Sequence, residues 1–383
     1  MPHRHCTRMA YDVAIIGAGI AGASLAAALS AHMSVIVLEA EDQPGYHTTG
    51  RSAAFWSVTY GGPVVQPLSS ASGPFLAHPP KSFSETGFLL QRGALMVGRA
   101  QDEAQIANFL SAFQGSGVAL ERLAAVGVQA HMPGVRAAWD RAVWEPSTTD
   151  IDVARLHAAY LRQAKQMGAV LATSQKVQGI SRGQQGWTLS CSSEEVVAHR
   201  IINAAGAWAD DVAQLAGIEP VGVTPFRRTM VQLEVAAQVP ADLPLVVDIN
   251  EQFYFKPDGP NRIWLSPHDE TPSPPCDAAP EEMDVALAIA RFEEVMDWPV
   301  VRVERTWAGL RNFAPDRLPV FGADPKGAGF FWCAGQGGFG IQTAPAIAAL
   351  LAAEILGQPP GADYDAINPA AFAPGRKSLR SRA

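Results

Sequence analysis

Glycines at fixed spacing near the start of the chain form a pattern that is typical of phosphate binding. The run Gly17-Ala18-Gly19-Ile20-Ala21-Gly22 matches G-x-G-x-x-G; it follows the apolar stretch Tyr11–Ile16 and opens the Ala- and Leu-rich stretch Ile20–Ser30. In such a turn one glycine allows a sharp bend, the next lets the backbone approach a pyrophosphate, and the third lets helix and strand pack closely. Amides at the start of the helix then face the phosphate charges.

An acidic residue after the second apolar run supports the same interpretation. Glu39 follows Val35–Leu38 and lies 20 residues after Gly19 (39 − 19). A carboxylate at this distance accepts hydrogen bonds from ribose hydroxyls. Because no arginine neighbours Glu39, we expect a dinucleotide with an unphosphorylated ribose, either FAD or NAD.

Three further stretches rich in small residues favour FAD. They are Gly45–Ala54 after the second strand, Ile201–Trp208 at the end of a buried strand, and Gly335–Ile341 before the last predicted helix. A flavin ring needs hydrogen-bond donors and small residues close to it. A Rossmann dehydrogenase without a flavin would have no need of a turn like Gly45–Ala54 after its second strand. The positive end of the last helix would stabilise the negative charge that builds up as a flavin accepts hydride.

The order of apolar strands and helices predicts two kinds of structural unit. A chain of 383 residues is long enough for two or three domains of roughly 100–200 residues. Strand, helix and strand over residues 11–40 follow parallel βαβ grammar. Apolar positions at helical spacing predict a helix over residues 150–168, with Asp152 capping its start and Gly168 its end.

We therefore expect an α/β fold with an α+β insertion. A Rossmann-like FAD-binding domain is expected over residues 11–83, 146–216 and 305–372, and a mainly antiparallel β-sheet substrate domain over residues 84–145 and 217–304. Residues 1–10 and 373–383 are expected to be flexible tails. Further expected elements are strands at 170–180, 187–191, 196–202, 230–235, 252–256 and 262–266, a helix at 343–356, and a surface loop at 271–280.

Composition argues against several other classes of protein. The net charge of −8 disfavours nonspecific nucleic-acid binding, and the basic end Arg376–Arg382 is expected to be solvated and disordered. No metal-ligand spacing links the cysteines, so we expect reduced thiols and no metal site. The segment Met1–Ala10 lacks the apolar core of a secretory signal, and no run of about 20 apolar residues could span a membrane. We expect a cytoplasmic protein, with peripheral membrane association left open.

Taken together, these motifs resemble the FAD-dependent D-amino-acid oxidase, glycine oxidase and sarcosine oxidase superfamily over about residues 11–357. The stretches Gly45–Ala54, Thr306–Arg311 and Gly337–Thr343 are most similar to the D-arginine dehydrogenase branch. The resemblance implies an FAD domain and a substrate domain over the flavin. It also implies hydride transfer from the Cα of a D-amino acid to flavin N5, giving an imine that water hydrolyses to a 2-oxo acid and ammonia.

The resemblance also assigns substrate-binding residues. Arg311 occupies the position of the arginine that binds the substrate carboxylate, for which a planar guanidinium is suited. Arg228 matches a second arginine, Tyr254 a substrate-contacting tyrosine, and Tyr60 a tyrosine on a mobile loop over the site. Their plainer interpretations are surface arginines and core tyrosines. Hydride transfer needs a neutral substrate amine, and we assign no side-chain base.

The cofactor residues that follow from the motifs and the resemblance are Gly17, Gly19, Ile20, Ala21, Gly22, Glu39, Ala40, Gly50, Arg51, Ser52, Ala53, Val177, Ala205, Gly206, Trp208, Gly309, Gly335, Gly337, Gly338, Phe339, Gly340, Ile341 and Gln342. Some members of the superfamily attach FAD through a cysteine near the substrate arginine. The stretch Thr306–Phe313 has no cysteine, and Cys333 is expected to be a small buried residue on a strand. We therefore expect non-covalent FAD.

Two positions depart from the arginine-preferring branch. Ala94 stands where that branch has an acid for the cationic side chain of the substrate, and Phe55 replaces a histidine near the ring. Leaving a cationic group without its acid costs a few kcal/mol where it is desolvated. We expect a preference for neutral, apolar or aromatic side chains, although Glu85 remains a possible source of negative charge.

Several alternatives stay open at this point. A 2-hydroxy acid or a secondary amine of the glycine or sarcosine type would use the same carboxylate arginine. An aromatic hydroxylase lacks support, since Gly322-Ala323-Asp324 is a poor substitute for its Gly-Asp dipeptide. A non-catalytic flavin-binding protein would not need the arginines and Tyr254. Sequence does not choose between oxygen and a quinone-type compound as electron acceptor.

Overall fold

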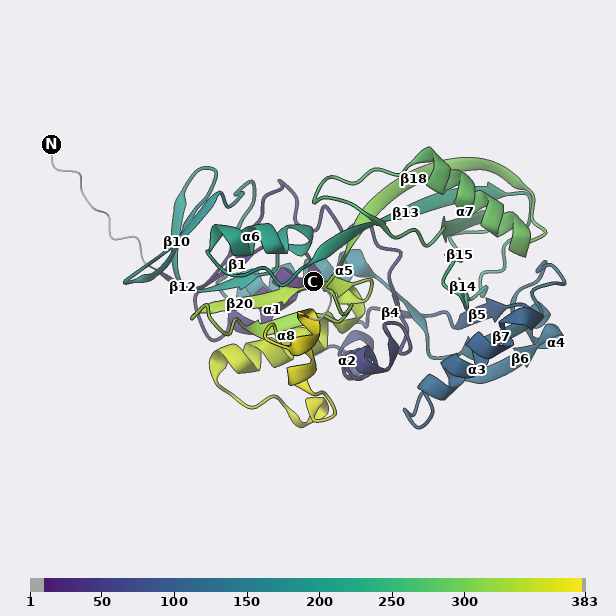
Figure 1. Cartoon of the computed structure of the whole chain (residues 1–383), viewed down its shortest axis with the longest axis horizontal. Coiled ribbons are helices and arrows are strands. Elements are labelled where there is room, and N and C mark those ends of the chain that lie inside the picture. The colour runs from purple at the N-terminus through teal and green to yellow at the C-terminus, as the bar shows by residue number, and fades with distance from the viewer. Residues whose placement is uncertain (1–9, 381–383) are drawn as a thin grey trace.

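The computed structural model describes residues 10–380, which form two large β-sheets, one small sheet and the helices packed on them (Figure 1). The first large sheet has a parallel centre in the order β20-β12-β1-β2-β9. Its strands are β1 (Tyr11–Ile16), β2 (Val35–Leu38), β9 (Val170–Ala172), β12 (Glu195–Asn203) and β20 (Phe330–Ala334), with β10 (Gly179–Gly183), β11 (Gly186–Ser190) and β19 (Val320–Ala323) added antiparallel.

Helices cover both faces of this sheet, which explains why β1 and β2 are apolar runs without alternation. On one face, Val13 and Ile15 pack in a core cluster with α1 (Ile20–Leu29) and α8 (Gly340–Leu356). On the other face, Ala14 and Ile16 pack with α6 (Ala209–Leu215). The α5 helix (Val153–Gln166) lies against α1 and begins at Asp152, whose carboxylate accepts a hydrogen bond from the Arg155 amide.

The second large sheet is mainly antiparallel, in the order β21-β18-β13-β16-β15-β14-β5-β7-β6, and only β14 and β5 pair in parallel. Its strands are β5 (Ala94–Gly98), β6 (Glu121–Ala124), β7 (Arg141–Glu145), β13 (Thr224–Val235), β14 (Leu245–Asp248), β15 (Tyr254–Pro257), β16 (Arg262–Ser266), β17 (Thr271–Pro272), β18 (Val300–Phe313) and β21 (Gln336–Gly337). Figure 1 shows β13 and β18 as a long pair that leads from the first sheet toward α7 (Glu282–Val295).

Successive side chains along these strands point to opposite faces of the sheet. One face packs in the core of the second domain, and the other face lies toward the candidate site. Val231 on β13 and Phe255 on β15 pack in the cluster that contains Phe292 of α7. Met230 and Tyr254, their neighbours in sequence, lie in a different cluster on the opposite face. The remaining elements are α2 (Gly62–Ala77), α3 (Glu103–Ala112), α4 (Ala125–His131) and a three-stranded sheet of β3 (Phe55–Trp56), β4 (Leu89–Gln91) and β8 (Thr149–Ile151). Within residues 10–380, no helix has the length and apolar character needed to cross a membrane.

The expected fold class is confirmed, with differences in detail. The strand expected at 170–180 is two strands, β9 and β10, separated by a turn-containing segment in which Ser174 has a left-handed φ of 56°. The domain boundary expected at residue 305 falls inside β18, because residues 300–313 pair with β13 as one strand. The loop expected at 271–280 contains the short strand β17, and otherwise its residues are exposed or partly exposed.

The C-terminal tail expected at 373–383 is attached to the molecule as far as the description extends. The Arg376 guanidinium donates hydrogen bonds to both carboxylate oxygens of Asp316 at 2.7 Å and to carbonyl oxygens that include those of Leu318 and Pro319. A polar end is thus ordered because one arginine forms an ion pair with a partly buried acid. Residues 381–383, and residues 1–9 of the expected N-terminal tail, lie outside the described residues.

We expect Arg376→Ala to lower the free energy of unfolding by about 3 kcal/mol, because it leaves Asp316 without its cation. Burial acts to raise the pKa of Asp316, but hydrogen bonds from Arg376 and Ser378 hold it below 3.8. A carboxyl with a lowered pKa stabilises the fold above its usual pKa and loses that effect as the pH falls through the folded value. Urea unfolding should therefore show a difference between the two proteins at pH 7 that shrinks below pH 4. The exposed Arg380→Ala is the control and should change the unfolding free energy by less than about 0.5 kcal/mol.

Candidate cofactor and substrate site

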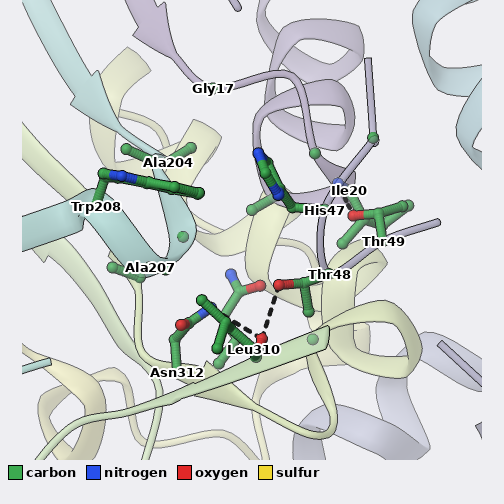
Figure 2. A pocket seen from close by; sticks show the side chains of 18 of the residues that line it. Gly17, Ile20, His47, Thr48, Thr49, Ala204, Ala207, Trp208, Leu310 and Asn312 are labelled. Carbon is green, nitrogen blue, oxygen red and sulfur yellow. Dashed lines mark hydrogen bonds between the residues drawn. The ribbon is translucent and has the colours of Figure 1, made fainter. Parts of the chain in front are cut away.

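A cavity of about 680 Å³ lies where the two large sheets meet. The loops after β1, β2 and β12 line it from the first sheet, β18 and Tyr254 line it from the second, and the segment before α8 closes it. Figure 2 shows part of this cavity, with Gly17 and Ile20 on one side, Trp208 and Ala204 on another, and Leu310 and Asn312 below. Residues distant in sequence therefore share one wall.

The glycines of the G-x-G-x-x-G run are required by close backbone contacts. Gly17 has φ +101°, and a Cβ there would lie 2.5 Å from the Ala204 carbonyl oxygen. A Cβ at Gly22 would lie 1.9 Å from the Gly17 carbonyl oxygen. Gly17 lines the cavity, whereas Gly22 serves the packing of turn and helix. Glycine is therefore required for this turn to pack against the 204–205 backbone and its own helix, and the turn with this shape lines the cavity, as a dinucleotide-binding turn should.

Glu39 lies at the end of β2, as a ribose-binding acid should. Its Oε2 accepts a hydrogen bond from the Ala18 amide at 2.7 Å, and its Oε1 accepts one from the Glu41 amide at 3.0 Å. The carboxylate is thus held against the glycine turn, while Glu39 still lines the cavity. A carboxylate has about four acceptor sites, so two amides leave capacity for ribose hydroxyls.

Sequence reasoning missed several side chains on the cavity wall, among them His47, Thr48 and Asn312. The His47 and Trp208 rings lie 4.7 Å apart, and the Thr48 hydroxyl donates to the Leu310 carbonyl oxygen at 2.7 Å (Figure 2). Asn312 is buried, and its Oδ1 has no hydrogen-bond partner. An orphaned acceptor in a cavity fits a donor on the cofactor. His47 and Thr48 belong to the flagged stretch Gly45–Ala54, whereas nothing in the sequence marked Asn312.

Most predicted cofactor residues lie on the cavity wall: Gly17, Gly19, Ile20, Ala21, Glu39, Ala40, Arg51, Ser52, Ala53, Val177, Ala205, Gly206, Trp208, Gly309, Gly335, Gly337, Gly338, Gly340 and Ile341. Gly22, Gly50, Phe339 and Gln342 are placed elsewhere. Gly50 lines a separate, smaller pocket beside Trp307. Phe339 packs against the Tyr60 and Phe313 rings. Gln342 is buried and binds the backbone of residues 57 and 60.

Arg51 lines the cavity, but its guanidinium is already engaged. It donates to the carbonyl oxygens of Ala278 at 2.9 Å and Ala308 at 3.0 Å, and it pairs with the Asp277 carboxylate. The Trp307 indole N–H donates to the Arg51 carbonyl oxygen at 3.0 Å. Arg51 therefore ties the 45–54 segment to β18, and a direct contact with the cofactor stays a prediction.

Arg311 and Arg228 lie on the same face of the second sheet. Strand register places Arg228 opposite Gly309, two residues before Arg311. Arg311 donates from Nη1 to the Tyr60 hydroxyl at 2.6 Å and from Nη2 to the Tyr254 hydroxyl at 3.5 Å. The structure thus brings together all four of the residues assigned to the substrate.

The Arg228 guanidinium is hydrogen-bonded through two of its nitrogens, whereas the third has no hydrogen-bond partner. It is 4% exposed, its Nε donates to the Asp269 carbonyl oxygen at 2.8 Å, and its Nη2 donates to Glu270 at 3.0 Å. Its Nη1 is buried without a hydrogen-bond partner. Since Arg228 lines the cavity, this orphaned donor is available to an anionic ligand.

The two arginines differ in their electrostatics. Burial lowers the pKa of Arg228, and the neighbouring Arg311 lowers that pKa further. Burial also acts to lower the pKa of Arg311, but Tyr60, Tyr254 and the nearby acids Glu270 and Asp269 leave it raised. Burial, together with the positive charges of Arg228 and Arg311, lowers the pKa of His268 to about 2. Burial also raises the pKa of Tyr60. His268 and Tyr60 are therefore neutral at physiological pH, and the arginines supply the positive charge.

Three residues were expected to affect the preference for the substrate side chain, and the structure shows where each lies. Ala94 is 1% exposed and belongs to the same apolar cluster as Tyr254 and Met230. Phe55 packs against the rings of Tyr60 at 5.2 Å and Tyr254 at 6.4 Å. Glu85 is exposed and does not line the cavity. The region around Tyr254 is therefore apolar and aromatic.

A parallel nucleotide-binding sheet, a glycine turn and a cavity shared with a second, antiparallel sheet define a dinucleotide-dependent oxidoreductase. A model of the family described as FAD dependent oxidoreductase matches residues 12–354. The chain belongs to that family. The superfamily and the FAD expected from the sequence are thereby confirmed, whereas the D-arginine dehydrogenase branch stays a prediction.

Individual relatives agree with this assignment. Glycine oxidase of Pseudomonas aeruginosa is 29% identical over 64% of this chain and 65% of that protein. Hydrogen cyanide synthase subunit HcnC of the same organism is 29% identical over 51% of this chain and 46% of that protein. The chain thus spans between about half and two thirds of these two relatives. The crystal structure of glycine oxidase from Geobacillus kaustophilus shares the fold, with a TM-score of 0.83, 23% identity, and 96% of this chain and 99% of that chain covered.

We expect acid precipitation to release the FAD into the supernatant and leave a colourless pellet, as absorbance spectra of the two fractions would show. Cys333 lines the cavity, but burial raises the pKa of its thiol to about 12, and the thiolate is the reactive form. Cys333→Ser should contain as much flavin as the unmodified protein. A yellow pellet that turns colourless with Cys333→Ser would contradict this expectation.

Proposed function

We propose that this enzyme oxidises the bond between Cα and nitrogen of a D-amino acid with a neutral, apolar or aromatic side chain. FAD, when bound, accepts the hydride, and the imine product is hydrolysed to a 2-oxo acid and ammonia. The observation that carries the proposal is the orphaned Nη1 of Arg228 beside Arg311 at the cavity. Two guanidiniums with donors to spare suit the carboxylate of an amino acid.

The two arginines would hold that carboxylate in different ways. Arg228 is fixed by Asp269 and Glu270 and offers Nη1 alone. Arg311 donates hydrogen bonds to the hydroxyls of Tyr60 and Tyr254, and these neutral partners would hold its planar fork in place for the substrate carboxylate. Because burial and the Arg311 charge lower the pKa of Arg228, an anion bound beside Arg228 would favour its charged form.

The surroundings of this pair support binding of the substrate amine in its neutral form. No carboxylate lies on the cavity wall contributed by the second sheet, from Arg228 to Asn312, so none is in place to retain an ammonium group. His268 packs edge-on against Tyr254 at 5.7 Å and is neutral. The chain therefore contributes orientation and electrostatic stabilisation, with no side-chain base.

Three observations support the finer parts of the proposal. The apolar cluster of Ala94, Met230 and Tyr254 favours neutral side chains. Relatives named glycine oxidase favour an amine over a hydroxy acid. The D configuration rests on the sequence resemblance. Both oxygen and a quinone-type acceptor remain within the proposal, as does a cytoplasmic location.

A panel of substrates mixed anaerobically with the oxidised enzyme tests the proposal, with bleaching of the flavin absorbance as the measurement. We expect D-amino acids to bleach the flavin and L-amino acids and 2-hydroxy acids to leave it oxidised. Arg311→Met should lower kcat/KM by roughly 100-fold, about 3 kcal/mol, because the carboxylate loses charge-assisted hydrogen bonds. Arg305→Met, an exposed arginine on the same strand, is the matched control. Bleaching by 2-hydroxy acids alone, or by nothing, would refute the proposed substrate class.

The same assay tests the preference among side chains. We expect kcat/KM for D-Leu, D-Met or D-Phe to exceed that for D-Arg by at least about tenfold, because a desolvated guanidinium would find no acid near Ala94. Steady-state kinetics at a fixed pH with equal enzyme give the comparison directly. A kcat/KM for D-Arg above the values for D-Leu, D-Met and D-Phe would contradict the expected preference and would mean that another residue supplies a negative charge for the guanidinium.

A further inference from the structure

Glu145 is a fully buried carboxylate at the end of β7, away from the cavity wall. Its Oε1 accepts hydrogen bonds from the Val58 amide at 2.8 Å and the Ser147 hydroxyl at 3.3 Å. Its Oε2 accepts from the hydroxyls of Ser57 at 3.1 Å and Thr59 at 2.5 Å. Within residues 10–380, none of the ion pairs involves this carboxylate. All its partners are neutral donors, and most belong to residues 57–59.

A second buried side chain, on a helix that packs on the first large sheet, holds the same turn. Gln342 on α8 accepts a hydrogen bond from the Ser57 amide at 3.0 Å. Its Nε2 lies within hydrogen-bond distance of the Ser57 carbonyl oxygen at 3.1 Å and the Tyr60 carbonyl oxygen at 3.3 Å. The turn 57–60 is therefore hydrogen-bonded to both β7 and α8, and a mobile loop at Tyr60 stays a prediction of the family resemblance.

The turn ends at the side chain that orients Arg311. The Tyr60 ring packs between Phe55, at 5.2 Å, and Phe339, at 5.9 Å. Its hydroxyl accepts a hydrogen bond from Arg311 Nη1 at 2.6 Å. A displacement of the turn would therefore move the Tyr60 hydroxyl and, through this one hydrogen bond, the Arg311 guanidinium.

The cost of burying a carboxylate explains why Glu145 favours one conformation of residues 57–60. A buried carboxylate costs several kcal/mol unless hydrogen bonds compensate for lost water. Glu145 meets this requirement only when the Val58 amide and both hydroxyls point to it together, so other conformations of the turn leave the charge exposed to an apolar interior. Charge-assisted hydrogen bonds are also about twice as strong as neutral ones. The carboxylate thus selects one conformation of residues 57–60.

We propose that Glu145 is a positioning residue for substrate binding: it fixes the 57–60 turn so that Tyr60 holds the Arg311 guanidinium ready for a carboxylate. The inference rests on the proposed function for its substrate, but the carboxylate site itself can be probed without turnover. Glu145 acts through Tyr60 and Arg311 and touches neither substrate nor FAD.

A double-mutant cycle on the FAD-loaded enzyme tests this role. Glu145→Gln should raise KM for the best amino acid, and the Kd for benzoate measured from the flavin absorbance, by about tenfold. We expect kcat to change less than about threefold and the Kd for FAD to stay the same, because residues 57–60 do not line the cavity. In a Tyr60→Phe background, Glu145→Gln should have no further effect on KM or on benzoate binding.

Controls separate positioning from loss of structure. Asp102→Asn replaces another buried acid that binds neutral donors, the Arg99 amide and the Asn250 side chain, far from the cavity, and should leave both constants unchanged. Thr59→Val removes one donor to Glu145 and should raise KM in the same direction, which tests the role if Glu145→Gln fails to fold. Equal effects of Glu145→Gln with and without the Tyr60 hydroxyl, or unchanged KM and Kd, would overturn the inference. Benzoate binding without amino-acid turnover would refute the proposed function and leave this test intact.

Discussion

Two neighbouring guanidinium groups on the wall of one cavity are the constraint on which the rest of the structure depends. Arg228 is buried and partly unsatisfied, and Arg311 lies beside it across the β13–β18 pair. Burial and the Arg311 charge lower the pKa of Arg228, whereas nearby tyrosines and acids leave the pKa of Arg311 raised. Asp269 and Glu270 fix Arg228, and under the proposed function an anionic ligand would take up its remaining donor.

The cofactor cavity and the arginine pair are built from the same strand. Gly309 to Asn312 of β18 line the cavity. The segment 45–54 is bound to this strand by the Thr48 hydroxyl, the Arg51 guanidinium and the Trp307 indole. Because these contacts join the two sheets, the fold rather than flexible side chains would set the distance between FAD and a carboxylate held as proposed. This suits a reaction that depends on orientation.

The sequence was sufficient to predict those parts of the structure whose contacts all lie within one continuous segment. The glycine turn and Glu39 were predictable because strand, turn, helix and strand are continuous in the chain, and their contacts, such as Gly22 against Gly17, are local. The helix that begins at Asp152 was predictable for the same reason. Arg311 and Arg228 were assigned by resemblance, and the antiparallel register then placed them together.

Contacts between distant segments could not be predicted. Glu145 and Gln342 meet the same turn although 197 residues separate them (342 − 145), and Arg376 reaches Asp316 from an end that its composition marks as solvated. In each case a polar side chain is buried because tertiary packing supplies its partner, and the residue type alone carries no sign of that partner. The sequence by itself therefore determined the cofactor-binding fold and the residue types of the site. Only the tertiary structure decided which polar groups hold that site in place, since burial makes such hydrogen bonds strong and burial is a property of the whole chain.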